Sequence, residues 1–318
     1  MIVNNFSKGY AQDYIKLKGS SQYPVFLATA LGVKDSYDEW IRTRDYDTFV
    51  EMCKGYGLHV EPDVLFVSPE DQSDKSGIIG AGNITTTFMM AEPFSKEKNG
   101  DVHVFVSRSK ETAKKAKRAG WYPMVVNGRL INRPFVDHLR FGKCLGFPDC
   151  CVDFFAQYNN WNVYSHPYES FKRTKKPSYY CNNFLMDHAY SYIHHIPCSY
   201  DCEKTKAFAK EVEKKLSEVD PEFVKEAKRV LSKPYLIFDE RNFIVFDGKL
   251  EDSTFYYTDT QYFENLAKPE DRLEFYEDIK RGNNLVVEKD RLVIKKDDET
   301  IKTVPKKEEW FAIDFKNE

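Results

Sequence analysis

The chain has 318 residues, of which 42% are hydrophobic and 31% charged, and its net charge is −3. This composition excludes a disordered chain, and the length predicts about two domains. The N-terminus shows no secretory signal pattern, and the longest apolar stretch, 23–33, is about half of the ~20 residues that a membrane helix needs. We therefore expect a cytoplasmic protein that does not act on a membrane.

The first 130 residues are expected to form a small α/β module. Residues 1–60 mix apolar and polar residues at helical spacing and are predicted to be mainly helical. A helix is predicted at 110–119, where Ser107 or Ser109 can cap its start. Apolar alternation predicts strands at 63–68, 101–107 and 122–126. The last two strands and the helix make a strand–helix–strand unit, which is typical of an α/β module over 1–130.

The rest of the chain divides into a helical and a β-rich part. Residues 131–235 are expected to form a helical Cys/His domain, and residues 236–318 a β-rich section with one helix at 269–281. The helices of the central domain are predicted at 150–158, 182–193, 202–218 and 221–231. Strands are predicted at 235–239, 242–247 and 254–257, followed by a β-meander at 284–288, 291–295, 300–304 and 310–315 with a turn at Asp297–Asp298. The expected fold class is α+β.

Positive charge is concentrated in the middle of the chain. Between residues 108 and 176, Lys and Arg outnumber Asp and Glu by nine, although the whole chain is acidic. Such a basic region suggests an anionic partner, either a small molecule or a nucleic acid. The alternative is a set of ordinary solvated faces, and the sequence leaves the oligomeric state open.

Cysteine and histidine gather in the same region. Eleven of the fourteen Cys and His residues fall between positions 138 and 202. In a reducing compartment, an odd number of clustered cysteines indicates a metal site or a catalytic thiol more often than disulfides.

The first cysteine pair is predicted at the start of a helix. Pro148 and Asp149 are a helix-start signal with Asp149 as the N-cap, so Cys150 and Cys151 occupy the first helical positions. Free N–H groups and the positive helix end favour anions there, and a thiolate is both a metal ligand and a nucleophile.

The second pair, Cys198 and Cys202, follows Pro197, which is predicted to end the preceding helix. If both cysteines are helical, their i,i+4 spacing places the two sulfurs on one face. Two helix starts, each with two thiols, can then converge on one site.

Four thiolates suit an iron–sulfur cluster, which is the favoured cofactor, or Zn²⁺. His195 is a further ligand or acid–base candidate. Whether Cys144, Cys181 and His194 join the site stays open.

Cys181, His188 and His195 recur every seven residues on one predicted helical stripe, about 10.5 Å apart, so they cannot share one ion. The alternatives are a metal-free thiol pair and buried unreactive cysteines.

Two segments carry a resemblance to a known family. LGFPDCCVDFF (145–155) and HIPCSYDC (195–202) resemble the signature segments of an uncharacterised prokaryotic, largely archaeal family, number 483 in the domain-of-unknown-function series. The residues that match are Leu145, Gly146, Phe147, Pro148, Cys150, Cys151, His195, Pro197, Cys198 and Cys202. The resemblance covers about 130–250 and implies no activity.

These patterns predict a metal- or iron–sulfur-dependent enzyme that acts on an anionic substrate, a nucleotide or a nucleic acid. The expected metal ligands are Cys150, Cys151, Cys198, Cys202 and His195, with His195 also as the catalytic proton donor. The expected substrate-binding residues are Arg133, Arg140 and Lys143. The alternative is a non-catalytic structural-zinc module that docks RNA or a protein partner. A third hypothesis is a metal-free thiol enzyme with Cys150 or Cys151 as the nucleophile.

Overall fold

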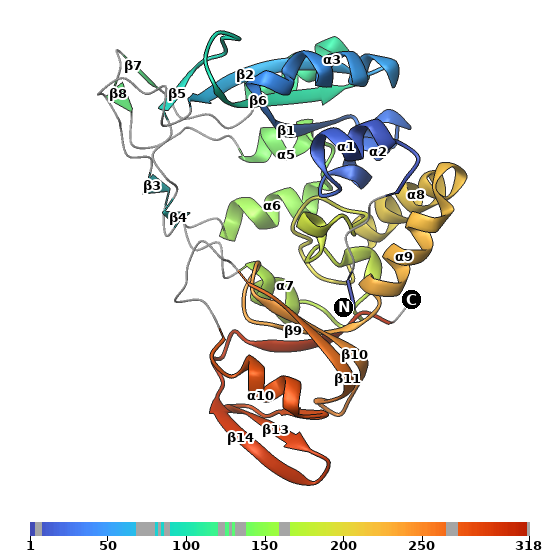
Figure 1. The fold of residues 1–318 in the computed structure, drawn as a ribbon, viewed down its shortest axis with the longest axis vertical. Coiled ribbons are helices and arrows are strands. Elements are labelled where there is room, and N and C mark those ends of the chain that lie inside the picture. Colours follow the sequence, from blue (N-terminus) through green and yellow to red (C-terminus); the bar gives the residue numbers. More distant parts are fainter. Residues whose placement is uncertain are drawn as a thin grey trace. The chain divides into compact units, whose positions relative to one another are not determined.

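The computed structural model describes residues 1–3, 8–67, 80–81, 84–85, 90–119, 125–126, 129–130, 138–158, 166–264 and 273–316 (Figure 1). Helices accompany two larger antiparallel sheets, so the fold class is α+β, as predicted. The contacts of the chain divide it into two compact units. We call them the smaller-sheet unit (Ser7–Asn162 and Glu211–Asp220) and the larger-sheet unit (Met1–Phe6, Val163–Lys210 and Pro221–Glu318). The domain boundaries expected near 130 and 235 stay a prediction.

The helices are α1 (Gln12–Lys18), α2 (Tyr23–Ala30), α3 (Tyr46–Gly55), α4 (Lys110–Ala119), α5 (His138–Cys144), α6 (Asp149–Tyr158), α7 (His166–Lys172), α8 (Glu203–Val219), α9 (Pro221–Leu231) and α10 (Tyr276–Arg281), with short 3₁₀ turns η1 (Thr43–Asp45), η3 (Tyr179–Cys181) and η4 (Met186–His188). The strands are β1 (Ser36–Arg42), β2 (His59–Val67), β3 (Gly80–Ala81), β4 (Ile84–Thr85), β5 (Met90–Pro93), β6 (Gly100–Ser107), β7 (Val125–Val126), β8 (Arg129–Leu130), β9 (Pro234–Ile237), β10 (Phe243–Glu251), β11 (Thr254–Phe263), β12 (Asn284–Val287), β13 (Arg291–Lys296), β14 (Glu299–Pro305) and β15 (Phe311–Asp314). None of these helices is long and apolar enough to cross a bilayer.

The smaller sheet has the strand order β1-β6-β2-β5 and is antiparallel. Its edge strand β1 lies within the stretch predicted to be mainly helical, so that prediction was wrong there. Strand β1 buries Tyr37, Glu39 and Ile41 on one face. A charged residue, Glu39, occupies one of these buried positions, so the apolar alternation could not be recognised in the sequence. The Tyr14 hydroxyl donates to its carboxylate at 2.8 Å, which compensates its burial.

Helix α4 packs on this sheet with the predicted bounds. Ala113, Ala116 and Ala119 form its buried stripe and pack with Phe105 of β6. The Ser109 hydroxyl accepts from the amide of Thr112 at 3.4 Å, as expected of an N-cap. Within the strand predicted at 122–126, residues 125–126 form β7, and residues 122–124 lie outside the described residues. Strand β7 pairs with β8 in a two-stranded sheet and not with β6.

The larger sheet has the order β14-β13-β12-β11-β10-β9-β15. Strands β9 to β14 follow one another as a meander, and the predicted turn at Asp297 and Asp298 joins β13 to β14. The prediction that the last strand ends the meander was wrong, because β15 returns to pair with β9 instead. All four residues of β9 are buried. A continuous apolar run of this kind is typical of a strand that is covered on both faces of its sheet.

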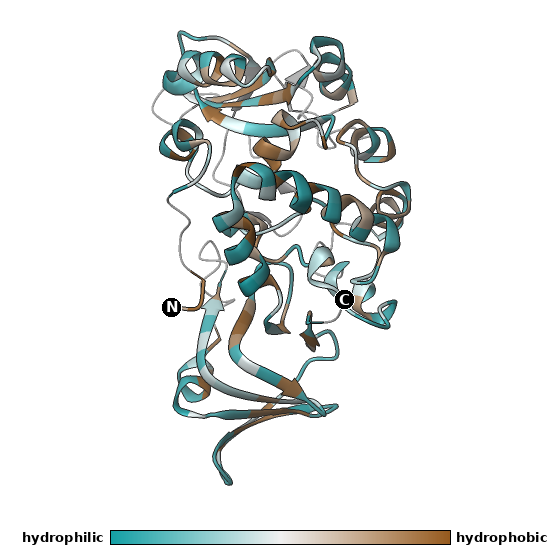
Figure 2. Cartoon of the chain, turned by 90° about the vertical axis from the view of Figure 1, so that its right-hand side faces the viewer, coloured by the Kyte–Doolittle hydropathy of each residue, from teal (hydrophilic) through white to brown (hydrophobic). Residues whose placement is uncertain are grey.

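The core of the larger sheet is built from aromatic and aliphatic residues. Phe246 and Phe255 stack with their ring centroids 4.1 Å apart. Helix α10 covers part of this core through the buried Ile279, whose carbonyl accepts from the Tyr257 hydroxyl at 2.7 Å. Figure 2 shows both hydrophobic and hydrophilic stretches on the strands of this sheet. Only the end of the helix predicted at 269–281 forms α10, and residues 269–272 lie outside the described residues.

The predicted helix at 182–193 is absent; the chain there has irregular backbone with one 3₁₀ turn, η4, and η3 directly precedes it. Polar side chains replace the helical hydrogen bonds: Asn182 Oδ1 accepts from the Phe184 amide at 3.1 Å, and Ser191 Oγ donates to the Ile193 carbonyl at 2.5 Å. Ala189 has a φ of 74°, which ends any right-handed helix. The helical stripe inferred for residues 181, 188 and 195 therefore does not exist.

Candidate metal centre

The first cysteine pair lies in the first turn of α6. The helix begins at Asp149, and the Pro148 carbonyl accepts from the amides of Cys151 at 2.9 Å and Val152 at 3.0 Å. Pro148, not Asp149 as predicted, therefore precedes the first helical residue. Cys150 and Cys151 are the second and third residues of the helix, where the N–H groups have no intrahelical partner.

The smaller sheet positions the turn that leads into α6. The Ser36 hydroxyl donates to the Cys144 carbonyl at 2.6 Å, and the Lys34 ammonium donates to the Leu145 carbonyl. The same ammonium lies 4.4 Å from the centroid of the Phe147 ring. Burial lowers the pKa of Lys34 to about 7, against the effect of nearby acidic residues. Lys34 and Ser36 were missed from the sequence, because nothing local connects them to a turn more than 100 residues away.

The second pair lies in the turn before α8. Cys202 immediately precedes the helix, and its carbonyl accepts from the Lys206 amide at 2.9 Å. The helix predicted from this position is thus confirmed. Cys198 lies in a bend and not in a helix, so the i,i+4 helical spacing was wrong. A turn nevertheless brings the two sulfurs together.

Neighbouring segments hold this turn in place. The Asp201 carboxylate accepts from the amides of Lys175 at 2.8 Å and Lys176 at 3.1 Å. Partial burial raises the pKa of Asp201, but these bonds and one from Ser199 outweigh it and lower the pKa overall. The Pro197 carbonyl accepts from the Ser170 hydroxyl at 2.6 Å. Hydrogen bonds to neighbouring segments therefore hold both ends of the turn.

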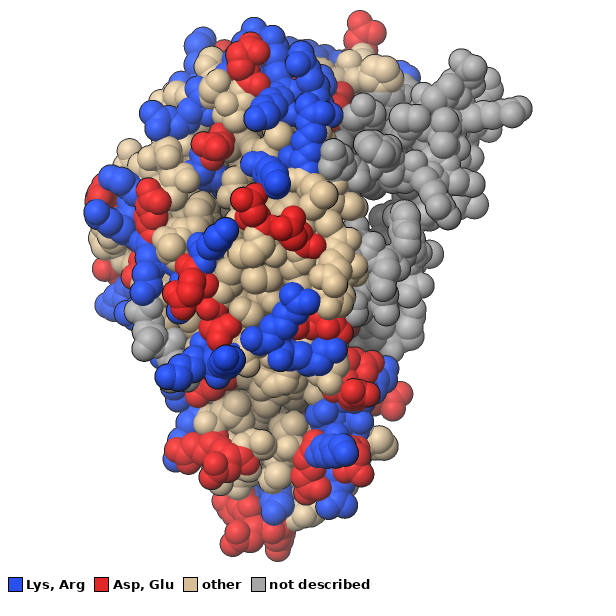
Figure 3. Space-filling model, turned by 180° about the vertical axis from the view of Figure 1, so that it is seen from behind, with Lys and Arg blue, Asp and Glu red and all other residues tan. Residues whose placement is uncertain are grey.

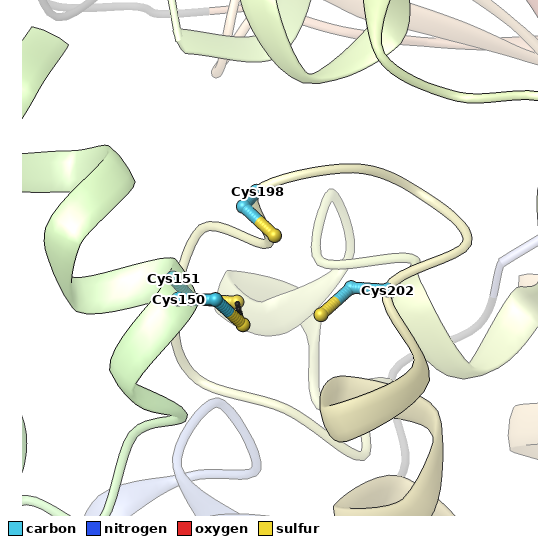
Figure 4. Close-up of side chains that lie close together, drawn as sticks. All are labelled: Cys150, Cys151, Cys198 and Cys202. Carbon is cyan, nitrogen blue, oxygen red and sulfur yellow. Dashed lines mark hydrogen bonds between the residues drawn. The ribbon is translucent and has the colours of Figure 1, made fainter.

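The four sulfurs converge. Sγ atoms of Cys150, Cys151, Cys198 and Cys202 all lie within 4.8 Å of one another, and their side chains point toward a common centre in Figure 4. The adjacent sulfurs of Cys150 and Cys151 are 3.9 Å apart. Ligands at about 2.3 Å around one tetrahedral ion lie about 3.8 Å from each other. Small shifts of side chains would therefore place four thiolates around a metal, and the group can hold one.

The other cysteines lie beside this group or away from it. The Cys181 thiol donates to the Cys202 carbonyl at 3.8 Å, and burial raises its pKa, which keeps it protonated. Cys144 packs among the alanines of α4, with its sulfur 4.0 Å from the Lys115 carbonyl. Neither belongs to the converging four.

His195 is buried, and its Nε2 lies 3.1 Å from the Thr205 hydroxyl in the first turn of α8. The converging group does not include it, and its role as a ligand or proton donor stays a prediction. His194 is half-buried beside it.

The predicted substrate residues are placed in part. Arg133 lies outside the described residues, whereas Arg140 and Lys143 are exposed on α5. The Lys143 ammonium lies 3.7 Å from a carboxylate oxygen of Asp149, the residue that begins α6. Their contact with a substrate stays a prediction.

The fold and the site define an α+β protein with a four-cysteine candidate metal centre. The family model described as "Protein of unknown function (DUF483)" matches residues 101–231, so this part of the chain is similar to that family. This match confirms the resemblance stated from the sequence, and both cysteine segments lie within it. Searches of the curated proteins and of the solved structures found no match.

Proposed function

We propose that the protein is a metal-dependent RNA-binding module, in which four cysteines hold one structural Zn²⁺ and the helices around the first pair present a basic face to RNA. The observation that carries the metal assignment is the convergence of four sulfurs within 4.8 Å of one another. A site filled by four thiolates leaves no ligand position open, which is typical of structural zinc.

The sulfur spacing supports a single ion over the iron–sulfur cluster that the sequence favoured. In an iron–sulfur cluster the thiolates bind two or more iron ions, and bridging sulfides separate these ions. Thiolates around a four-iron cluster therefore stand farther apart than the edges of one tetrahedron. The span of 4.8 Å is close to the single-ion value.

Metal analysis of protein purified without oxygen tests this assignment. We expect a colourless protein with one zinc per chain, and Co²⁺ substitution should produce the absorption of tetrahedral cobalt bound to thiolates. Brown protein with iron and sulfide would overturn the single-ion proposal in favour of a cluster. Protein without metal, whose thiols all react freely, would overturn the ligand assignment.

The basic face lies on α4 and α5, which pack together in the smaller-sheet unit. The alanine stripe of α4 is buried, and Lys110, Lys115 and Arg118 are exposed, whereas Lys117 donates to Glu61 of the smaller sheet. The face consists of Lys110, Lys114, Lys115, Arg118, Arg140 and Lys143. Glu111 and Asp149 each lie 3.7 Å from one of these lysines, so positive charge remains in excess. Figure 3 shows Lys and Arg gathered in the upper part of the view from behind.

A row of cations on two helices suits a polymer of phosphates better than one small anion, because each phosphate contact adds to the affinity. Most contacts of this kind go to the nucleic-acid backbone and need no base recognition. This geometry supports a nucleic acid as the partner of the face, of which we propose RNA, and competition with DNA and with an acidic protein distinguishes the alternatives.

The salt dependence of RNA binding measures how many cations of this face contact phosphates. Replacing Lys115 and Arg118 with glutamine removes two cations, so the slope of log K against log salt should become shallower by about 1.4 for single-stranded RNA. Lys225→Gln with Lys228→Gln on the exposed side of α9 is the matched control and should leave the slope unchanged. An equal effect of both pairs, or no RNA binding at low salt, would contradict the proposal.

A metal-dependent enzyme acting on a nucleotide or nucleic acid is the second candidate. It is favoured by the half-exposure of Cys150 and Cys198, which leaves these ligands accessible to an incoming group. An enzyme of this kind would open a ligand position when substrate binds. The spectrum of the Co²⁺ protein should then change on adding nucleotide or RNA, whereas a structural centre keeps its spectrum.

A further inference from the structure

A cavity of about 770 Å³ lies in the larger-sheet unit, and no cysteine is among its lining residues. Helix α7, the turn between β12 and β13, and the segment that enters β15 surround it. Its size falls within the ~300–1,000 Å³ of small-molecule sites. Four aromatic residues line it: Tyr168, Phe171, Trp310 and Phe311.

Contacts with one another and with neighbouring residues hold these rings in place. Phe171 stacks on the buried Phe311 with ring centroids 4.3 Å apart and an interplanar angle of 16°. Trp310 meets Phe238 edge-on at 4.9 Å. The Tyr168 hydroxyl donates to Glu308 at 3.4 Å. Tyr168, Phe171 and Trp310 are only half-buried, so fixed aromatic surface remains available to a ligand.

Charged groups complete the lining. Lys289 and Lys306 line the cavity, and neither forms an ion pair with any part of the chain that the structure describes. The Lys306 amide donates to the Asp290 carbonyl at 2.9 Å, which fixes its backbone beside the β12–β13 turn. Asp290 and Glu308 also line the cavity.

We propose that this cavity binds a nucleotide, with its base stacked on the aromatic side chains and its phosphate near Lys289 and Lys306. Aromatic side chains bind bases through their faces without regard to sequence. The two carboxylates accept hydrogen bonds from the ribose hydroxyls or from the amino group of a base, as carboxylates do in other nucleotide sites. The same chemistry is offered by a free mononucleotide and by one nucleotide of a single RNA strand.

Calorimetric titration of the metal-loaded full chain tests the proposal. The probes are AMP, GMP, CMP and UMP, a seven-nucleotide single-stranded RNA, and inorganic phosphate. We expect at least one mononucleotide or the RNA to bind, and phosphate alone to bind much more weakly because it cannot stack. Saturable binding by a mononucleotide identifies the free ligand, and binding by the RNA alone identifies the polymer. If no probe binds, or phosphate binds as well as the nucleotides, the proposal is wrong.

Two variants, each with a control, test whether the nucleotide binds in this cavity. Tyr168→Leu removes a stacking ring and should weaken binding about tenfold, whereas Tyr168→Phe keeps the ring and should bind like the original protein. Lys306→Met removes a charge and should also weaken binding about tenfold. Lys296→Met, at an exposed lysine on β13, is the matched control.

The readout is independent of the metal proposal, because none of these residues is a candidate metal ligand. Zinc content should be equal in all four variants. Nucleotide binding that Tyr168→Leu and Lys306→Met leave unchanged would place the ligand elsewhere and overturn the proposal. Loss of RNA binding in Lys115→Gln with Arg118→Gln, but not in Tyr168→Leu, would likewise assign the RNA to the basic face alone.

Discussion

Replacing Cys150 or Cys198 with serine is expected to lower the affinity for the structural metal at least about a hundredfold. Residues that only orient a metal ligand already account for ten- to hundredfold effects, and these two supply the ligand atoms themselves. Both side chains are half-exposed, so exchanging sulfur for oxygen removes little packing. A hundredfold weaker site lowers the stability of the metal-loaded protein by about 2.7 kcal/mol when the free metal concentration is well above both dissociation constants.

Competition with a chelator, followed by zinc analysis and thermal unfolding, measures this effect. Cys53→Ala is the matched control, because Cys53 is fully buried on α3 and outside the converging group. The control should keep its zinc at chelator concentrations that strip the two serine variants. If those variants retain zinc as tightly as the original protein, the four-cysteine assignment is wrong.

The stability of the smaller-sheet unit is expected to fall by about 3 kcal/mol as the pH rises from 6.5 to above 9. His103 is buried on β6, with Nε2 3.2 Å from an Asp38 oxygen and Nδ1 3.4 Å from an Asp63 oxygen. Burial lowers the pKa of His103, but the two hydrogen-bonded carboxylates outweigh it and raise the pKa to about 9. Two acceptors require both ring nitrogens to donate, which only the protonated ring can do.

The direction of this pH dependence follows from the raised pKa. In the unfolded chain a histidine titrates near 6.5, so the stabilisation is fully present below that pH and is lost as the pH rises through about 9. An NMR titration of the His103 ring should give a midpoint near 9. His103→Phe, which keeps an aromatic ring against Trp40, should be less stable and should show little pH dependence in this range. A midpoint near 6.5 in the original protein would contradict the ion-pair assignment.

The segments that carry the four converging cysteines could be predicted from the sequence because their signals are local. Cysteine pairs beside Pro148 and Pro197 marked two places where the chain begins a helix, and both helices form. Helix α4 was predicted with its bounds for the same reason, since an alanine every third residue among charged residues determines which side packs.

Errors arose where distant partners decide the local structure. Asn182 donates to the Leu231 carbonyl at 2.9 Å, and this long-range bond helps to hold an irregular backbone where the apolar pattern favoured a helix. Strand β1 buries Glu39, whose carboxylate is stabilised by the Tyr14 hydroxyl and by the Lys18 ammonium 3.6 Å away, both distant in the sequence. Likewise, β15 pairs with β9, and no property of its own residues distinguishes that neighbour from β14.

The sequence by itself determined the α+β class, the segments that carry the four cysteines and the basic character of α4. Propensity, capping and charge act over a few residues, so they can be read along the chain. Only the tertiary structure decided that four sulfurs converge within 4.8 Å, that Lys34 and Ser36 hold the turn before α6, and that an aromatic cavity lies beside the larger sheet. These features depend on contacts between residues far apart in the chain. The free energy of such contacts cannot be inferred from the residues adjacent in the sequence.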